Sequence, residues 1–176
     1  MSKRTPAYLV LKSAVLFLSL LCFYPLSATN PQKKEMKELN VKKVSLANVA
    51  VENVPALLDK EKVDFQSINT VNWKAFPYQP EVQFRIAHTD DAILIHYKVK
   101  EASVRAVATG DNGAVWEDAC VEFFSVPAGD GIYYNVECNC VGTLLIGAGG
   151  GRSNREHAPQ EVMDKVQRWS SLGRES

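Results

Sequence analysis

The chain has 176 residues, the length of one ordinary domain, and its 46% hydrophobic and 23% charged residues are typical of a globular protein rather than a disordered one. Its formal net charge is zero. Nucleic-acid binding is therefore not indicated, because that function needs a surplus of basic side chains on one face and a recognisable reading motif.

Residues 1–28 have the pattern of a secretory signal peptide. Lys3 and Arg4 precede an apolar run over residues 14–26, and small residues follow it. The run is shorter than the roughly 20 residues of a full membrane span, and Lys12 interrupts its front. We expect cleavage and export to the periplasm, the cell surface or the medium, with no stable membrane span afterwards.

Two alternatives to cleavage exist. The apolar run could remain as a membrane anchor, or Cys22 could be lipidated, although Leu21 before it is bulkier than such processing prefers. Removing residues 1–28 takes away three basic and no acidic side chains, which leaves 17 basic and 20 acidic ones. We expect residues 29–40 to be a flexible tether and residues 41–176 to be the folded domain.

The first predicted elements are weakly marked. Residues 41–51 alternate loosely between apolar and polar, and residues 54–58 could form one helical turn. The next pattern is much clearer, since alternating apolar residues over 82–88 and 93–99 flank the turn sequence Thr89-Asp90-Asp91. This predicts a hairpin with one buried face.

Further strands are predicted over 103–108, 115–126 and 132–140, separated by the turn sequences at 111–113 and 127–131. Hairpins at such short intervals favour an all-β, antiparallel β-sandwich. The glycine-rich residues 147–157 lack the Gly-Lys-Ser/Thr ending of a phosphate loop and indicate a flexible loop. A short C-terminal helix is expected from Pro159 to near Gly173.

Strand parity predicts a polar, partly aromatic sheet face. If Val121 and Phe123 face the core, the residues that point the other way lie beside one face of the neighbouring strand. Carboxylates and carboxamides there could bind sugar hydroxyls, and an aromatic ring could stack on a pyranose. The alternative is a face that simply contacts water. The residues that point away from the core on the first strand are Asp118, Cys120, Glu122 and Phe124. Those on the facing side of the neighbouring strand are Tyr133, Asn135, Glu137 and Asn139.

The same parity sets the expected state of the cysteines. Cys120 and Cys138 or Cys140 lie on opposite faces, which argues against a disulfide between them. The spacing of Cys138 and Cys140 is too tight for a zinc knuckle. We expect buried or half-buried free thiols.

An enzyme is the first functional alternative. Glu122 and Glu137 on adjacent strands could be the carboxyl pair of a glycoside hydrolase, but their separation in space cannot be derived from sequence. No serine-hydrolase or zinc-protease motif is present. A second alternative is a structural or interaction sandwich that uses another surface.

The aromatic residues Trp73, Phe76 and Tyr78 stand beside two prolines at the entrance to a predicted strand. They could be further sugar platforms. Large aromatic side chains in such a position more often close one end of a sandwich core, and we expect that structural role here.

Three stretches of the chain resemble the family nine carbohydrate-binding modules of Bacteroidetes type. They are NWKAFPYQPEVQFRIAHTDDAILIHYKVKE, VWEDACVEFF and YYNVECNCVGTLL, and the likeness covers about residues 65–176. Its most specific parts are the Trp-x-Asp pattern leading into Val-Glu-x-Phe and the Asn-x-x-Gly at 139–142. The resemblance implies a β-sandwich that binds sugar chains between aromatic side chains, often with structural calcium.

By this resemblance Trp116 would be a stacking platform and Glu122 an acceptor for sugar hydroxyls, with Asn135 and Glu137 as weaker candidates. The binding arginine of the family is not matched securely, since Arg85 and Arg152 are both candidates. No cofactor is certain, and calcium at the turn acids is an open possibility. Those acids are Asp90, Asp91, Asp111 and Asp130.

The end of the chain departs from the resemblance. The second stacking tryptophan of such modules comes from a loop near the end of the domain, whereas this sequence stops shortly after Trp169. We therefore expect a domain truncated in its final strands, with weaker sugar binding than a version that has them. The function predicted is noncatalytic carbohydrate binding in an exported polysaccharide-utilisation (carbohydrate catabolic) system, with glycoside hydrolases as neighbours.

Overall fold

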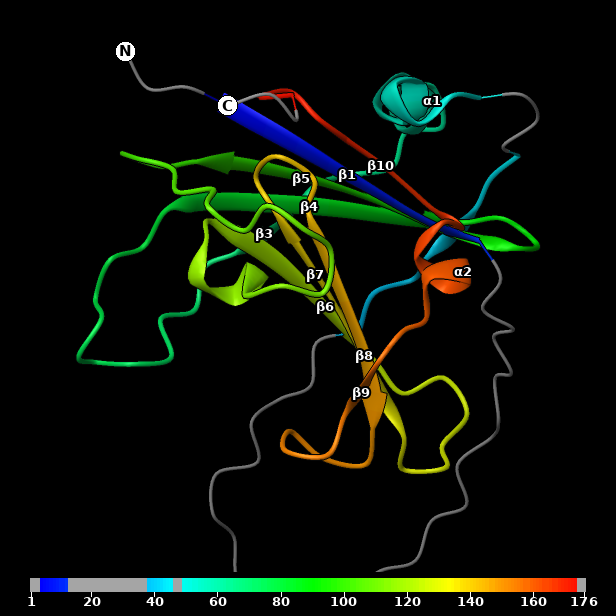
Figure 1. Ribbon diagram of the computed structural model, residues 1–176. Coiled ribbons are helices and arrows are strands. Elements are labelled where there is room, and N and C mark those ends of the chain that lie inside the picture. The colour runs from blue at the N-terminus through cyan, green and yellow to red at the C-terminus, as the bar shows by residue number, and fades with distance from the viewer. Residues whose placement is uncertain (1–3, 13–37, 46–48, 174–176) are drawn as a thin grey trace, which may run out of the picture.

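The computed structural model describes residues 4–12, 38–45 and 49–173, and it confirms an all-β sandwich (Figure 1). One sheet has six strands in the order β10-β1-β5-β4-β2, with β3 also paired to β4. All its pairs are antiparallel except β2 with β4. The strands are β1 (Arg4–Lys12), β2 (Lys42–Lys43), β3 (Gln66–Ile68), β4 (Glu81–His88), β5 (Ala92–Lys100) and β10 (Val166–Ser170).

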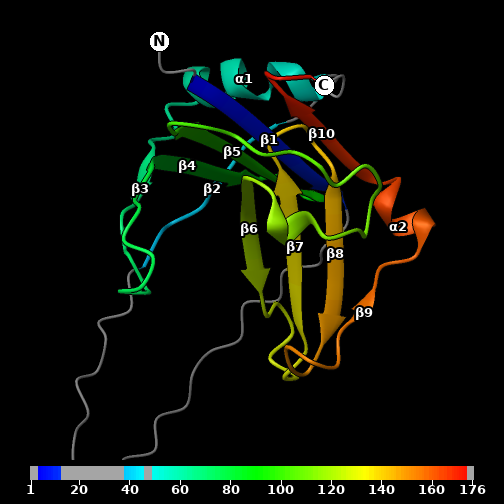
Figure 2. The same cartoon turned by 60° about the vertical axis from the view of Figure 1, so that its left-hand side comes forward.

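The other sheet has four antiparallel strands in the order β6-β7-β8-β9. Its strands run across those of the six-stranded sheet, as the turned view shows (Figure 2). β6 is the outermost strand on one side. The strands are β6 (Cys120–Ser125), β7 (Tyr133–Asn139), β8 (Leu144–Gly149) and β9 (Glu156–His157).

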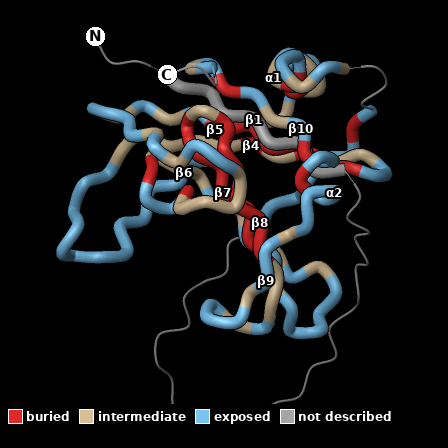
Figure 3. Tube along the Cα trace, in the orientation of Figure 1, coloured by how far each residue is buried: buried red, intermediate tan, exposed pale blue. Residues whose placement is uncertain are grey.

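The main core lies between the two sheets. Burial runs along β5, β7 and β8 where the sheets meet and fades toward the far end of the four-stranded sheet (Figure 3). Because side chains alternate along a strand, every second residue of β5, β7 and β8 enters this layer. The buried members are Ile95, Tyr97, Val136, Cys138, Leu144, Ile146, Met163 and Val166, with Val121 and Phe123 packed against them.

A second core lies on the other face of the six-stranded sheet, under helix α1 (Val54–Lys60). Pro55 sits in the first turn of this helix, where a missing N–H costs nothing, and Val54 and Leu58 present one apolar side. Both are fully buried against Ala87 and Leu94 of the hairpin. The helical turn predicted at 54–58 is thereby confirmed.

The predicted β4–β5 hairpin is present, but the expectation of one buried face was wrong. Ile93, Ile95 and Tyr97 point to the other sheet, while Leu94 and His96 on the opposite side are also buried, beneath α1. The helix is short and its apolar stripe weak, so the sequence did not show that it covers the sheet.

Three further boundaries differ from prediction. The described residues 103–108 form no strand, and Val115–Glu117 is a 3-10 turn, η2, ahead of β6. The C-terminal helix α2 spans only Gln160–Met163 and is followed by strand β10. Val162, Val166 and Trp169 fitted one side of a helix by their spacing, but Val166 and Trp169 lie in β10, where Val166 is buried and Trp169 is 36% exposed.

The predicted signal peptide and most of the predicted tether fall outside the described residues, apart from 4–12 and 38–40. The backbone of Arg4–Lys12 forms β1 between β5 and β10. Cleavage and export stay predictions.

Candidate functional site

The candidate site is the outer face of the four-stranded sheet, opposite the main core. Parity is as predicted, because Val136 and Cys138 lie in the core and Asn135 and Glu137 point away from it. In the register of β6 and β7, Glu122 stands directly opposite Glu137. Directly paired residues on one face have their Cβ atoms within about 5.5 Å, so the two carboxylates belong to one site.

This face is not simply a wet surface. Asn135 is 0% exposed and Glu137 4% exposed. Asn135 Nδ2 donates to Glu137 Oε1 at 2.7 Å, and Arg155 Nη1 lies 4.0 Å from the same oxygen. The Arg155 guanidinium also lies over the ring of Tyr133, 5.7 Å from its centroid. The polar face therefore contains a partly enclosed cluster rather than separate solvated side chains.

Two acceptors in this cluster have no donor. Asn135 Oδ1 and Glu137 Oε2 are both buried, and neither has a hydrogen-bond partner among the residues that the structure describes. A buried acceptor without a donor costs roughly 1–3 kcal/mol, so folded proteins rarely keep one without a reason. A ligand that brings hydroxyl donors would remove this cost.

Gly147 of β8 leaves room for two members of the cluster. A Cβ atom at this position would lie 2.6 Å from Asn135 Oδ1, so the carboxamide would have to shift. Its neighbour on the other side is Arg155, whose Cβ would be 3.6 Å away. The glycine therefore lets both the carboxamide and the arginine lie against the sheet.

Glu122 forms the exposed edge of the cluster. Loss of water around its carboxyl raises its pKa, the charge of Glu137 raises it further, and Arg155 and Arg152 act in the opposite direction. The thiol of Cys120 lies 4.0 Å from Glu122 Oε1. Burial and the nearby carboxylates raise the pKa of that thiol to about 12, so it remains protonated.

Trp116 lies on η2, just before β6, and is 55% exposed. Its neighbour Val115 is fully buried, which anchors the turn, and η2 packs against β6 and β7. An exposed indole on an anchored turn is suited to stacking on a sugar ring. The structure thus places Trp116 at the surface and on the approach to the strand that carries Glu122.

Asp118, between Trp116 and Glu122, has a structural role. Its carboxylate accepts the backbone N–H groups of Val107 and Ala108 at 2.9 and 3.0 Å and Asn139 Nδ2 at 2.9 Å. Burial opposes its ionisation, but these donors and nearby Arg105 hold its pKa below the ordinary value. Asp118 therefore fixes residues 107–108 to β7.

The Asn-x-x-Gly motif is also structural. Asn139 Oδ1 accepts the N–H groups of Val141 and Thr143 at 3.2 and 2.8 Å, and Gly142 has φ +89°. A left-handed residue at that position is favoured as glycine. The motif therefore shapes the β7–β8 turn behind the site.

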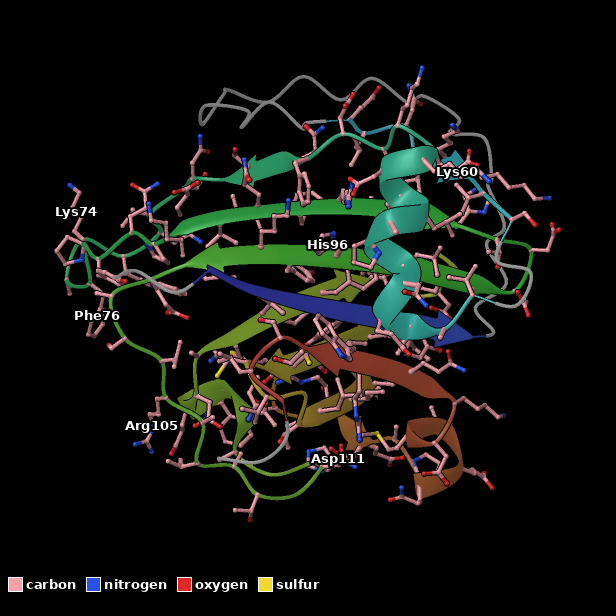
Figure 4. All side chains as sticks on the ribbon, turned by 90° about the horizontal axis from the view of Figure 1, so that it is seen from above. Lys60, Lys74, Phe76, His96, Arg105 and Asp111 are labelled. Carbon is pink, nitrogen blue, oxygen red and sulfur yellow. The ribbon has the colours of Figure 1, made fainter. Side chains whose placement is uncertain are left out.

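Arg85 lies on the other sheet, away from the other candidate sugar-binding residues. It lies on β4 under α1, is 3% exposed, and donates to Asp59 Oδ1 at 2.6 Å and to the carbonyl of Pro55 at 2.9 Å. Its Nε lies 3.1 Å from His96 Nδ1 (Figure 4 shows His96 beneath the helix). Its guanidinium also stands 4.4 Å from the Phe65 ring centroid.

Sequence reasoning missed Arg155 and weighed Arg152 only as an alternative. The positive charges of both arginines oppose the rise in the pKa of Glu122. Arg155 also forms an ion pair with Glu137. Their one sequence signal is two basic residues in the loop that precedes the two-residue strand β9, whose His157 pairs with Gly147. Contact with the acidic face depends on how that loop folds back.

The turn acids considered for calcium have protein partners. Asp111 accepts the N–H of Leu144 and pairs with Arg168 at 2.5 Å, and Asp130 accepts the N–H of Ile132. No group of three or more potential metal-binding side chains occurs within the described ranges. Across the same part of the chain, Cys120, Cys138 and Cys140 are free thiols.

Together these features define a class of protein: a two-sheet sandwich that carries an acceptor-rich cluster on one outer face and an exposed tryptophan on the turn that precedes β6. The sequence profile of carbohydrate-binding family 9 matches residues 52–176, and the chain belongs to this family. No curated protein sequence matches it.

A solved structure supports the same assignment. The chain is similar to the crystal structure of a candidate carbohydrate-binding protein from Bacteroides uniformis, with 59% identity and a TM-score of 0.72. The match covers 77% of this chain and 62% of that one. In the described residues, no helix is both long and apolar enough to cross a membrane.

Proposed function

We propose that this chain is a noncatalytic carbohydrate-binding module whose sugar lies on the outer face of the four-stranded sheet. The observation that carries the proposal is the pair of buried acceptors, Asn135 Oδ1 and Glu137 Oε2, for which the described residues supply no donor. Neighbouring hydroxyls of a pyranose are donors of the right kind. Glu122 accepts from a third hydroxyl, and Trp116 stacks on the apolar face of a ring.

The proposed setting is outside the cytoplasm. A basic start followed by an apolar run and small residues supports export by a signal peptide. In the periplasm or at the cell surface, such a module would hold a polysaccharide for glycoside hydrolases that work beside it. Family membership supports sugar as the ligand.

The test is calorimetric titration of the purified chain with a panel of neutral gluco-, xylo- and manno-oligosaccharides. Trp116→Ala is expected to lower the affinity about tenfold or more, because a stacked indole contributes both buried apolar area and ring attraction. Trp169→Phe, which keeps an aromatic ring on β10, is the matched control. Unchanged affinity in a folded Trp116→Ala variant would contradict the proposed site.

One observation favours hydrolysis as a second candidate function. Glu122 and Glu137 face each other directly across β6 and β7, and the pKa of Glu122 is raised. A carboxyl group with a raised pKa that faces a second carboxyl group is the arrangement of a proton donor and its partner. Release of reducing ends from the same panel, abolished by Glu122→Gln, would identify an enzyme; binding without release supports a module.

A further inference from the structure

The loop that joins β3 to β4, residues 69–80, exposes three large aromatic side chains. Trp73 is 69% exposed, Phe76 75% and Tyr78 61%. The expectation that they close one end of the core was therefore wrong. Figure 4 shows Phe76 and Lys74 at the tip of this loop, beyond the ends of the hairpin strands.

The loop is held in a defined shape. Gln79 Nε2 donates to the carbonyl of Asn69 at 2.8 Å, which closes its neck, and the N–H of Phe76 donates to the carbonyl of Trp73 at 3.0 Å. The hydroxyl of Tyr78 accepts the N–H of Ala102 at 3.0 Å. A loop whose backbone is ordered before a ligand arrives loses less entropy when the ligand binds.

A cleft links the base of this loop to the site already described. Its volume is about 450 Å³, and it lies between the loop base and the outermost strand β6. Tyr97 lies beside it and donates from its hydroxyl to the carbonyl of Glu122 at 3.3 Å. Glu122 therefore belongs both to the outer face and to the cleft. The lining includes Ile68, Tyr78, Pro80, Glu101, Cys120 and Glu122.

We propose that the sugar chain continues from Glu122 across the edge of β6, through this cleft, to the aromatic loop. The inference rests on the proposed function and names its ligand class: an oligosaccharide of several units, held along its length rather than by one terminal sugar. Tyr78 contacts the unit in the cleft, and Trp73 supplies a second stacking ring beyond it.

The composition of the loop favours a glycan over a protein partner. The aromatic residues alternate with polar ones, including Asn72, Lys74 and Gln79. Three carboxyl side chains line the cleft, those of Glu101, Asp118 and Glu122. A protein interface has a contiguous apolar centre that is poor in charge. A sugar chain instead offers flat apolar ring faces edged by hydroxyls, which fits separate rings with polar groups between them.

The experiment compares ligand lengths. Gluco-, xylo- and manno-oligosaccharides of one to six units are titrated into the chain and into Trp73→Ala, Trp116→Ala and, as a control on an exposed apolar residue of α2, Val162→Ala. We expect the affinity of the native chain to rise about tenfold or more between one and four units. Trp73→Ala should remove this rise and keep the affinity for the shortest ligand, whereas Trp116→Ala should weaken every length.

Four results would overturn the inference. The first is a native affinity that does not depend on length, and the second is a length dependence that survives in Trp73→Ala. The third is a concentration-dependent dimer, seen by light scattering, that Trp73→Ala dissociates, since the loop would then be a protein interface. The fourth is no binding at any length by a folded chain, which removes the proposed function as well and is thereby distinguishable from the first two.

Discussion

The outer faces of the two sheets both bury a charged side chain, and they treat it in opposite ways. Under α1, Arg85 has the carboxylate of Asp59, the carbonyls of Pro55 and Val63 and the ring of Phe65 as partners. On the other sheet, Glu137 accepts one hydrogen bond from Asn135, and the guanidinium of Arg155 lies 4.0 Å from the same oxygen. Its second oxygen has no donor from the described parts of the chain.

This difference separates a residue whose hydrogen bonds are met by the protein from one whose second oxygen is left without a donor. A charge whose hydrogen-bonding groups are matched by protein partners fixes the segments that supply those partners. A buried acceptor with no donor makes the free protein less stable and gains only when a ligand arrives. Arg85 therefore holds α1 on its sheet, whereas under the proposed function Glu137 accepts a hydrogen bond from the ligand.

The largest effect is expected at Arg85. Arg85→Met should lower the free energy of unfolding by about 3 kcal/mol, because two carbonyls under α1 lose a charged donor. Urea unfolding measures this. Asp59→Asn is the control and should cost less than about 1 kcal/mol, since Asp59 is 70% exposed. A stable Arg85→Met variant with impaired sugar binding would make Arg85 a ligand residue after all.

The next largest effect is expected at Glu137, on the outer face of the four-stranded sheet. Glu137→Gln keeps the shape but converts the acceptor without a partner into a donor, so sugar affinity should fall about tenfold or more. The free energy of unfolding should stay the same or rise by a few tenths to about 1 kcal/mol. Calorimetric titration and urea unfolding measure the two quantities. Glu117→Gln on η2 is the matched control. A large loss of stability would show that Glu137 is structural.

The smallest effect is on pH dependence. Because the pKa of Glu122 is raised in the folded chain, the folded state holds this proton more tightly than the unfolded state. Stability should therefore fall as pH rises from the ordinary value of 4.5 through the raised pKa, by less than about 1 kcal/mol for this half-buried group. Urea unfolding across this range should show a shallower slope in Glu122→Gln than in the native chain, and burial of Glu101, which raises its pKa as well, accounts for a slope that remains in both.

Strand parity carried most of what the sequence could predict. Val121, Phe123 and Val136 alternate with polar residues strictly enough to fix which side of β6 and β7 meets the core. The same period placed Glu122 and Glu137 on one face. Local pattern is sufficient here because side-chain direction in a strand is set by the backbone alone.

The remaining features depend on contacts between distant segments. Arg85 faces a helix rather than a ligand because α1 covers it, and its partner Asp59 on that helix lies 26 residues earlier in the chain. Arg155 reaches Glu137 only because its loop folds back over Gly147. The family resemblance identified Trp116 and Glu122, but no local pattern shows that Asn135 and Glu137 are enclosed.

One carboxylate, that of Asp118, accepts two backbone N–H groups of a segment outside both sheets, and this has a consequence for how the molecule opens. Residues 103–109 have no ladder of their own, and the N–H groups of Val107 and Ala108 depend on Asp118. The pKa of Asp118 is lowered, so its contribution is present above the unfolded value of 3.8 and disappears as pH falls through the folded one. In acid this segment should exchange its amide hydrogens as a separate cooperative unit while both sheets stay protected.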